Sequence, residues 1–141
     1  MRAMVERLER EVQRMPQVDC PVRHYFAPGM YAREISIPKG TVLTGAVHKR
    51  ENIAVLSKGS LMLATDNGPK RIDAPHTLTV SPGAKNVAVS LEDAVWTNFF
   101  ATDETDPEKL VELLTESTAQ ELIGGKSNVQ LLQAGPQKLE E

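Results

Sequence analysis

Histidine and cysteine are the residues of this chain that are most versatile as bases, nucleophiles and metal ligands, and they are few. The 141 residues include three histidines and one cysteine. His24 lies in an aromatic run and His76 follows a proline, and neither has a sequence neighbour that would make it a base or a metal ligand. Cys20 precedes Pro21. We expect this lone cysteine to be a small buried apolar residue rather than a nucleophile. A single cysteine also excludes a disulfide within the chain.

Two further residues form a pair by their spacing. Trp96 and Asn98 are separated by one residue in an apolar run, so in a strand both side chains lie on one face. The indole is then either part of the core or a platform for a sugar or another ligand. The usual local motifs of catalytic sites are absent, with no G-x-S-x-G, phosphate-binding loop, paired acidic motif or Cys-x-x-Cys.

His48 belongs to a longer pattern that is anchored by glycines. Gly40 is followed after five residues by Ala46, and then come His48, Asn52 and Gly59. A second group at comparable intervals consists of Pro75, Ser81, Gly83, Asn86 and Ser90.

These spacings resemble the two strand-turn-strand motifs of the cupin superfamily, G-x5-H-x-H-x3-E-x6-G and G-x5-P-x-G-x2-H-x3-N. The resemblance covers residues 22–101 and implies a small cupin-like or jelly-roll β-barrel. Such barrels usually hold a metal with three imidazoles and one carboxylate. Here Ala46, Asn52 and Asn86 stand at three of the four ligand places, and His48 alone keeps a ligand side chain.

The loss of these ligands argues against a metal centre. One imidazole with two neutral amides has neither the charge nor the softness to hold a transition metal tightly, so we expect no metal and no cofactor. Glu51 would supply a carboxylate only if a bulge shifted its strand by one residue. We expect a neutral His48, hydrogen-bonded to Asn52 or Asn86. No catalytic residue is predicted, and the candidate ligand-binding residues are His48, Asn52, Asn86, Trp96 and Asn98.

The elements that would position these residues are short strands. Turn residues separate β-like runs, and Asn67-Gly68 is typical of a tight hairpin turn. About eight strands at close spacing, without a helical pattern between them, favour an all-β sandwich or barrel over residues 17–103. The predicted strands are 31–37, 41–48, 53–56, 60–65, 70–73, 77–80, 86–91 and 95–100.

Helices are expected on both sides of the barrel. Residues 104–125 read as a helix with an N-cap at Thr105 or Asp106, Pro107 in its first turn and Gly124-Gly125 at its end. In the tail, 126–141, the run 129–132 is either a final strand or a loose extension. Residues 1–16 read as a helical arm that either lies on the barrel or packs against another subunit. Its apolar seam follows a heptad spacing at Met1, Val5, Leu8, Val12 and Met15.

Composition limits the partners and the compartment. The formal net charge is −3, with basic residues scattered among acidic ones, so nucleic-acid binding is not expected. No run approaches the roughly 18 apolar residues of a membrane span. The charged N-terminal segment does not read as a secretory signal, and we expect a cytoplasmic protein or one in particles assembled there. The seam predicts a homo-oligomer, with a dimer as the first expectation.

A second resemblance, to small cupin-like proteins of tailed bacteriophages, rests on residues 20–26, 31–35 and 95–100. It implies a non-enzymatic virion protein, such as a capsid cement or decoration protein that docks on capsid protein. The alternative is a cupin-type small-molecule-binding protein, or a metal-dependent enzyme with an atypical site at His48.

Overall fold

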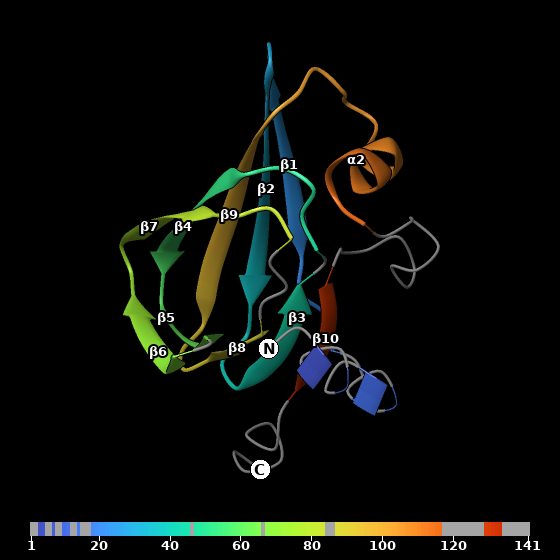
Figure 1. The fold of residues 1–141 in the computed structure, drawn as a ribbon. Coiled ribbons are helices and arrows are strands. Elements are labelled where there is room, and N and C mark those ends of the chain that lie inside the picture. Colours follow the sequence, from blue (N-terminus) through green and yellow to red (C-terminus); the bar gives the residue numbers. More distant parts are fainter. Residues whose placement is uncertain are drawn as a thin grey trace.

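The computed structural model of the protein consists of two five-stranded antiparallel sheets that face each other (Figure 1). It describes residues 3–4, 7, 10–11, 14, 18–45, 47–65, 67–83, 87–116 and 129–133. The first sheet has the order β1 (Val22–Ala27), β2 (Met30–Ile37), β9 (Ala94–Ala101), β4 (Asn52–Lys58) and β7 (His76–Val80). The second has the order β10 (Val129–Gln133), β3 (Thr41–Gly45), β8 (Val87–Ser90), β5 (Ser60–Thr65) and β6 (Gly68–Asp73).

The predicted all-β, jelly-roll class is confirmed, with two differences. Among the described strands, ladder hydrogen bonds do not join the two sheets, so the sheets form an open pair rather than a closed barrel. The strand predicted over 41–48 ends at Gly45, and His48 takes part only in an isolated bridge to Thr115. The expected hairpin turn is present, since Thr65 pairs with Gly68 across the turn between β5 and β6.

The glycines of the spaced pattern have a conformational cause. Gly40, Gly59 and Gly83 all have positive φ, between 79° and 82°, a region that other residues rarely adopt. At Gly59 the space is also restricted, because an added Cβ would lie 2.3 Å from the carbonyl oxygen of Asp93. The turns between strands therefore preserve the glycine frame even though the ligand places have changed.

The main core is a cluster of buried apolar residues that come from both sheets. It contains Ile35, Ile37, Leu56, Leu61 and Ile72, together with Cys20 and Ala94. Cys20 is buried as the sequence predicts, and burial, with a smaller effect of Asp19, raises the pKa of its thiol to about 12. The thiol therefore stays protonated and packs as an apolar group.

The hairpin of β1 and β2 extends beyond the second sheet, and α2 (Pro107–Leu114) lies beside its end (Figure 1). Asp106 is the N-cap, accepting a hydrogen bond from the backbone N–H of Glu108, and Pro107 occupies the first turn as predicted. Leu110 and Leu114 pack against Tyr31 and Phe100. The predicted helix 104–125 is shorter in the structure, because it begins at Pro107 and ends at Leu114, where Thr115 takes an extended conformation; residues 117–125 lie outside the described residues.

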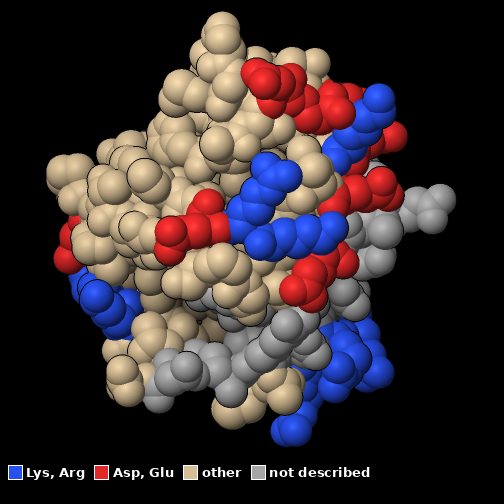
Figure 2. Space-filling model, turned by 45° about the horizontal axis from the view of Figure 1, so that its top comes forward, with Lys and Arg blue, Asp and Glu red and all other residues tan. Residues whose placement is uncertain are grey.

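The N-terminal seam cannot be placed, since Met1, Val5, Leu8, Val12 and Met15 all lie outside the described residues. The run expected at 129–132 is a strand, β10, which pairs with β3. In the described part of the chain, no helix has the length and apolar character needed to cross a membrane. On the face drawn in Figure 2, acidic and basic side chains lie next to one another in the middle and at the upper right, and a group of basic side chains lies at the lower right.

Candidate functional site

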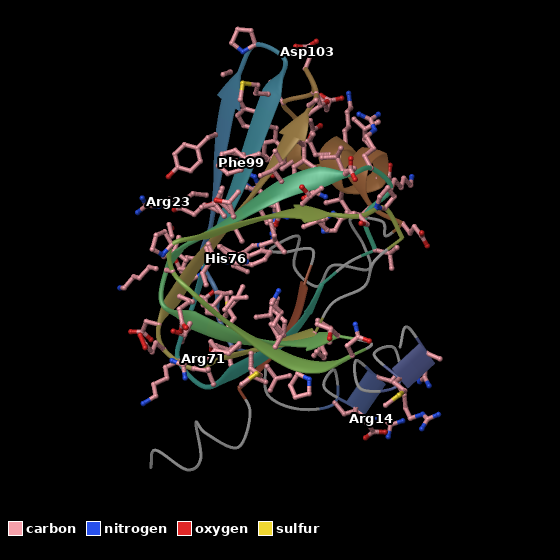
Figure 3. All side chains as sticks on the ribbon, turned by 60° about the vertical axis from the view of Figure 1, so that its left-hand side comes forward. Arg14, Arg23, Arg71, His76, Phe99 and Asp103 are labelled. Carbon is pink, nitrogen blue, oxygen red and sulfur yellow. The ribbon has the colours of Figure 1, made fainter. Side chains whose placement is uncertain are left out.

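A cavity of about 110 Å³ lies between the two sheets and is partly open to the surface. Side chains from both sheets project into the space between them (Figure 3). Its described lining is mainly aliphatic, with four polar or aromatic-polar side chains at Arg33, His48, Trp96 and Asn98. Three of the five predicted ligand-binding residues, His48, Trp96 and Asn98, therefore meet in one place.

The described residues of the second sheet that line this cavity are all apolar. They are Leu43, Gly45, Leu61, Leu63 and Ala88. Leu43 and Leu63 both pair with Ala88, so these three side chains form one row across β3, β8 and β5. Gly45 follows Leu43 on the same face of β3. A Cβ added at Gly45 would meet no atom within 4 Å, so this position opens onto unfilled space.

The first sheet supplies both apolar and polar residues to the lining, and strand register places two of the polar ones side by side. Arg33 on β2 pairs with Asn98 on β9, and Ile35 pairs with Trp96 in the adjacent inward-facing row. Both Arg33 and Asn98 are only 8% exposed. The apolar residues Ile35 and Ile37 continue the inward face of β2 toward the main core. The cavity thus has a polar end at Arg33 and Asn98.

A chain of hydrogen bonds fixes the amides at this end. The indole Nε1–H of Trp96 donates to Oδ1 of Asn98 at 2.8 Å, and Nδ2 of Asn98 donates to Oδ1 of Asn52 at 2.9 Å. Nδ2 of Asn52 then donates to the carbonyl oxygen of Arg50 at 3.2 Å. Asn52 is buried but is not among the described residues that line the cavity. It orients Asn98 and does not itself face a ligand.

His48 lies in the segment that follows β3, and it lines the polar end of the cavity. Its ring lies 5.8 Å from that of Phe100, and its Nδ1 is buried without a hydrogen-bond partner. Asn52 hydrogen-bonds to Asn98 and to the carbonyl oxygen of Arg50, so the expected bond between His48 Nδ1 and Asn52 is absent, and the alternative partner Asn86 lies outside the described residues. An unmatched acceptor costs less than an unmatched N–H, which favours the neutral tautomer with its hydrogen on Nε2.

Burial, and to a smaller extent the charge of Arg33, lowers the pKa of His48 to about 4. The imidazole is therefore neutral at ordinary pH, as predicted. Burial also lowers the pKa of Arg33, to about 10, while Tyr31 acts in the opposite direction. The guanidinium remains positively charged at neutral pH. The electrostatic character of the polar end is thus set by a buried cation beside neutral groups.

Sequence reasoning missed Arg33 and the partner of His24. Arg33 alternates with Tyr31, Ile35 and Ile37 on the inward face of β2, and this period of two is the signal that would have found it. His24 Nδ1 lies 2.6 Å from the hydroxyl of Tyr31, across the β1–β2 hairpin. The remaining predicted residue, Asn86, lies outside the described residues.

The residues at this site do not fit the metal centre that the cupin motifs imply. His48 is the one imidazole that lines the cavity within the described lining, and the Asn52 oxygen accepts a hydrogen bond from Asn98. Glu51 is exposed, so it does not replace the missing carboxylate. Within the described ranges, no three His, Cys, Asp or Glu side chains lie close enough together to hold a metal ion.

Comparisons with known proteins identify the fold. No family model matches the sequence, and no curated protein does so. Among solved structures, ectoine synthase from P. lautus is 13% identical, with 68% of this chain and 75% of that chain covered and a TM-score of 0.54. KdgF from Halomonas sp. is 15% identical, with 66% and 90% covered and a TM-score of 0.51.

A cupin superfamily protein from Desulfitobacterium hafniense is 9% identical, with 62% of this chain and 82% of that chain covered and a TM-score of 0.51. The chain therefore has the cupin fold, as its glycine pattern predicts. The bacteriophage resemblance and the capsid-decorating role find no support in these neighbours.

Proposed function

We propose that this protein binds a small organic molecule in the cavity between its two sheets. The observation that carries the proposal is the division of that cavity into an apolar wall on the second sheet and a polar end at Arg33, His48 and Asn98. Small-molecule sites are typically concave and mainly apolar, with a few polar groups that fix orientation. The role as a binding protein replaces the structural role that the sequence favoured.

The hydrogen-bond chain supports a preorganised site rather than a packing defect. Trp96, Asn98 and Asn52 hold one another in place, so the polar end does not need a ligand to order it. Well-packed interiors leave few voids larger than a water molecule. One neighbour in fold, the ectoine synthase, is by its name an enzyme that makes a small molecule, and the shared architecture is compatible with such a site.

Filling the cavity provides the test. Gly45→Leu should place an aliphatic side chain in unfilled space without a backbone clash. Thr79→Leu is the matched control, because Thr79 is exposed between the two lining residues Leu78 and Val80 and faces the opposite side of β7. Both variants should melt cooperatively.

The ligands for this test are isobutyrate, isobutyramide and isobutanol, each titrated by calorimetry into the wild type and the two variants. We expect the wild type and Thr79→Leu to bind at least one of the three, and Gly45→Leu to bind none. Binding that survives in a folded Gly45→Leu would move the site elsewhere. Absence of binding by the wild type to all three would contradict the proposal.

A further inference from the structure

We infer that the ligand is a small carboxylate, bound through its two oxygens to the guanidinium of Arg33, with a short apolar body against Leu43, Leu63 and Ala88. This inference rests on the proposed function and specifies its ligand. It starts from the one charged side chain within the described lining of the cavity. No described Asp or Glu lines that cavity, so a ligand anion would not meet a carboxylate there.

The position of Arg33 is unusual for an arginine. It is 8% exposed, in the interior row of a sheet whose next inward residues are Ile35 and Ile37. Burying a guanidinium is costly unless it is well hydrogen-bonded. Arg33 also interacts with the protein itself, and its five N–H donors allow it to hold a protein group and a ligand at the same time.

A carboxylate is an anion whose geometry matches this donor. The planar fork of a guanidinium makes two parallel hydrogen bonds to the two oxygens of a carboxylate. The other polar groups at this end, the amide of Asn98 and the imidazole of His48, are neutral. A cationic ligand would therefore meet the charge of Arg33 without a compensating anion from the described lining.

The size of the cavity restricts the rest of the molecule. A closed cavity of about 150 Å³ holds a benzene-sized ligand. The present cavity, at about 110 Å³, suits a compact aliphatic body somewhat smaller than benzene. Propionate, butyrate and isobutyrate are of this size. The apolar row of Leu43, Ala88 and Leu63 lies on the facing sheet, where it can contact such a body.

The test compares isobutyrate with isobutyramide, which has nearly the same shape but no charge. Affinities are measured by calorimetry in a carboxylate-free buffer at neutral pH, with wild type, Arg33→Met and Arg33→Lys. Since hydrogen bonds to charged groups are the stronger ones, we expect wild type to prefer isobutyrate by about ten- to a hundredfold. Arg33→Met should lose this preference and still bind isobutyramide, which shows that the site is intact. Arg33→Lys should retain part of it.

The outcomes separate the two proposals. If wild type binds isobutyramide as tightly as isobutyrate, or if Arg33→Met keeps the preference, the carboxylate inference is wrong while the cavity remains a binding site. If wild type binds isobutanol but neither of these compounds, the carboxylate inference is wrong while the cavity remains a binding site; if it binds none of the three, the proposed function itself is contradicted for ligands of this size. If Arg33→Met does not fold, the ratio in Arg33→Lys decides, because an unchanged ratio would show that the guanidinium fork does not recognise the carboxylate.

Discussion

Arg33 and Asn98 are register partners on β2 and β9, and both side chains line the cavity between the sheets from the same row. The pairing places a buried cation next to an amide whose orientation is fixed by Trp96 and Asn52. The polar end of the cavity is therefore built from residues 65 positions apart in sequence, and its geometry depends on the register of the sheet.

Replacing Asn98 should destabilise the fold. In Asn98→Ala the indole N–H of Trp96 and Oδ1 of Asn52 lose their partners in a buried environment, which should cost about 2–4 kcal/mol of unfolding free energy. Urea unfolding measures the loss. Asn67→Ala is the control, because Asn67 is an exposed turn amide and its replacement should change stability by less than about 0.5 kcal/mol. Equal costs in the two variants would mean that the buried chain is not structurally important.

His48 should make the protein sensitive to acid. The unfolded chain binds a proton at this residue near its ordinary pKa of 6.5, whereas burial lowers the pKa in the folded protein to about 4. The contribution of neutral His48 is thus fully present above pH 6.5 and is lost as the pH falls toward 4. A pKa that differs by 1 between the folded and unfolded protein corresponds to about 1.4 kcal/mol. The loss of unfolding free energy is therefore on the order of 3 kcal/mol.

His48→Gln provides the comparison, because its side chain does not titrate. Between pH 7 and pH 4 the unfolding free energy should fall by about 3 kcal/mol more in wild type than in the variant. Acidic residues titrate in both proteins and cancel in the difference. Parallel pH profiles would show that His48 is not buried as a neutral imidazole.

Gly59 should be less replaceable than Gly83, another glycine of the motif frame. Gly59→Ala adds a Cβ that would lie 2.3 Å from the Asp93 carbonyl oxygen, in addition to the strain of φ +82°. Gly83→Ala is a matched control, with φ +80° and no neighbour within 4 Å of the added Cβ. The conformational cost of about 1–2 kcal/mol is common to both, so Gly59→Ala should be clearly the less stable variant in thermal melts. A similar melting temperature for the two would contradict the close approach.

The heptad seam remains a prediction about assembly. Val5→Glu together with Leu8→Glu should weaken an oligomer without preventing cooperative melting, since the seam contributes a contact and not the core. Light scattering gives the mass of wild type and variant. A monomeric wild type whose melting temperature falls in the variant would instead show that the arm folds back on its own sheets.

The sequence predicted the fold better than the site. Turn glycines with positive φ are local requirements, so Gly40, Gly59 and Gly83 indicated the cupin arrangement even where ligands were lost. The polar end depends on which residues of distant strands become neighbours. The motif led us to expect a hydrogen bond between His48 and Asn52. In the structure the Asn52 oxygen instead accepts a hydrogen bond from Asn98, a residue on a neighbouring strand. Arg33 was missed because it belongs to no motif, although its alternation with Ile35 and Ile37 marked an inward position.

The length of α2 also could not be predicted from local sequence signals alone. Asp106 and Pro107 fix the start of the helix through short-range hydrogen bonding and backbone geometry, and both act as expected. The end is set by tertiary contacts instead. After Leu114 the backbone bridges to the His48 segment, where Lys49 N–H donates to the carbonyl oxygen of Leu114 and Glu116 N–H donates to that of Val47. This bridge also supports the segment that carries His48 to the cavity.

Trp96 permits the most direct measurement of ligand binding in the cavity. It is the single tryptophan of the chain, it lines the cavity, and its indole N–H donates to Asn98. The indole 1H–15N resonance is therefore one assignable signal at the proposed site. On titration with isobutyrate we predict a saturable shift of this resonance in wild type and Thr79→Leu, and none in a folded Gly45→Leu. An indole resonance that does not move in wild type, or that moves equally in Gly45→Leu, would contradict the account.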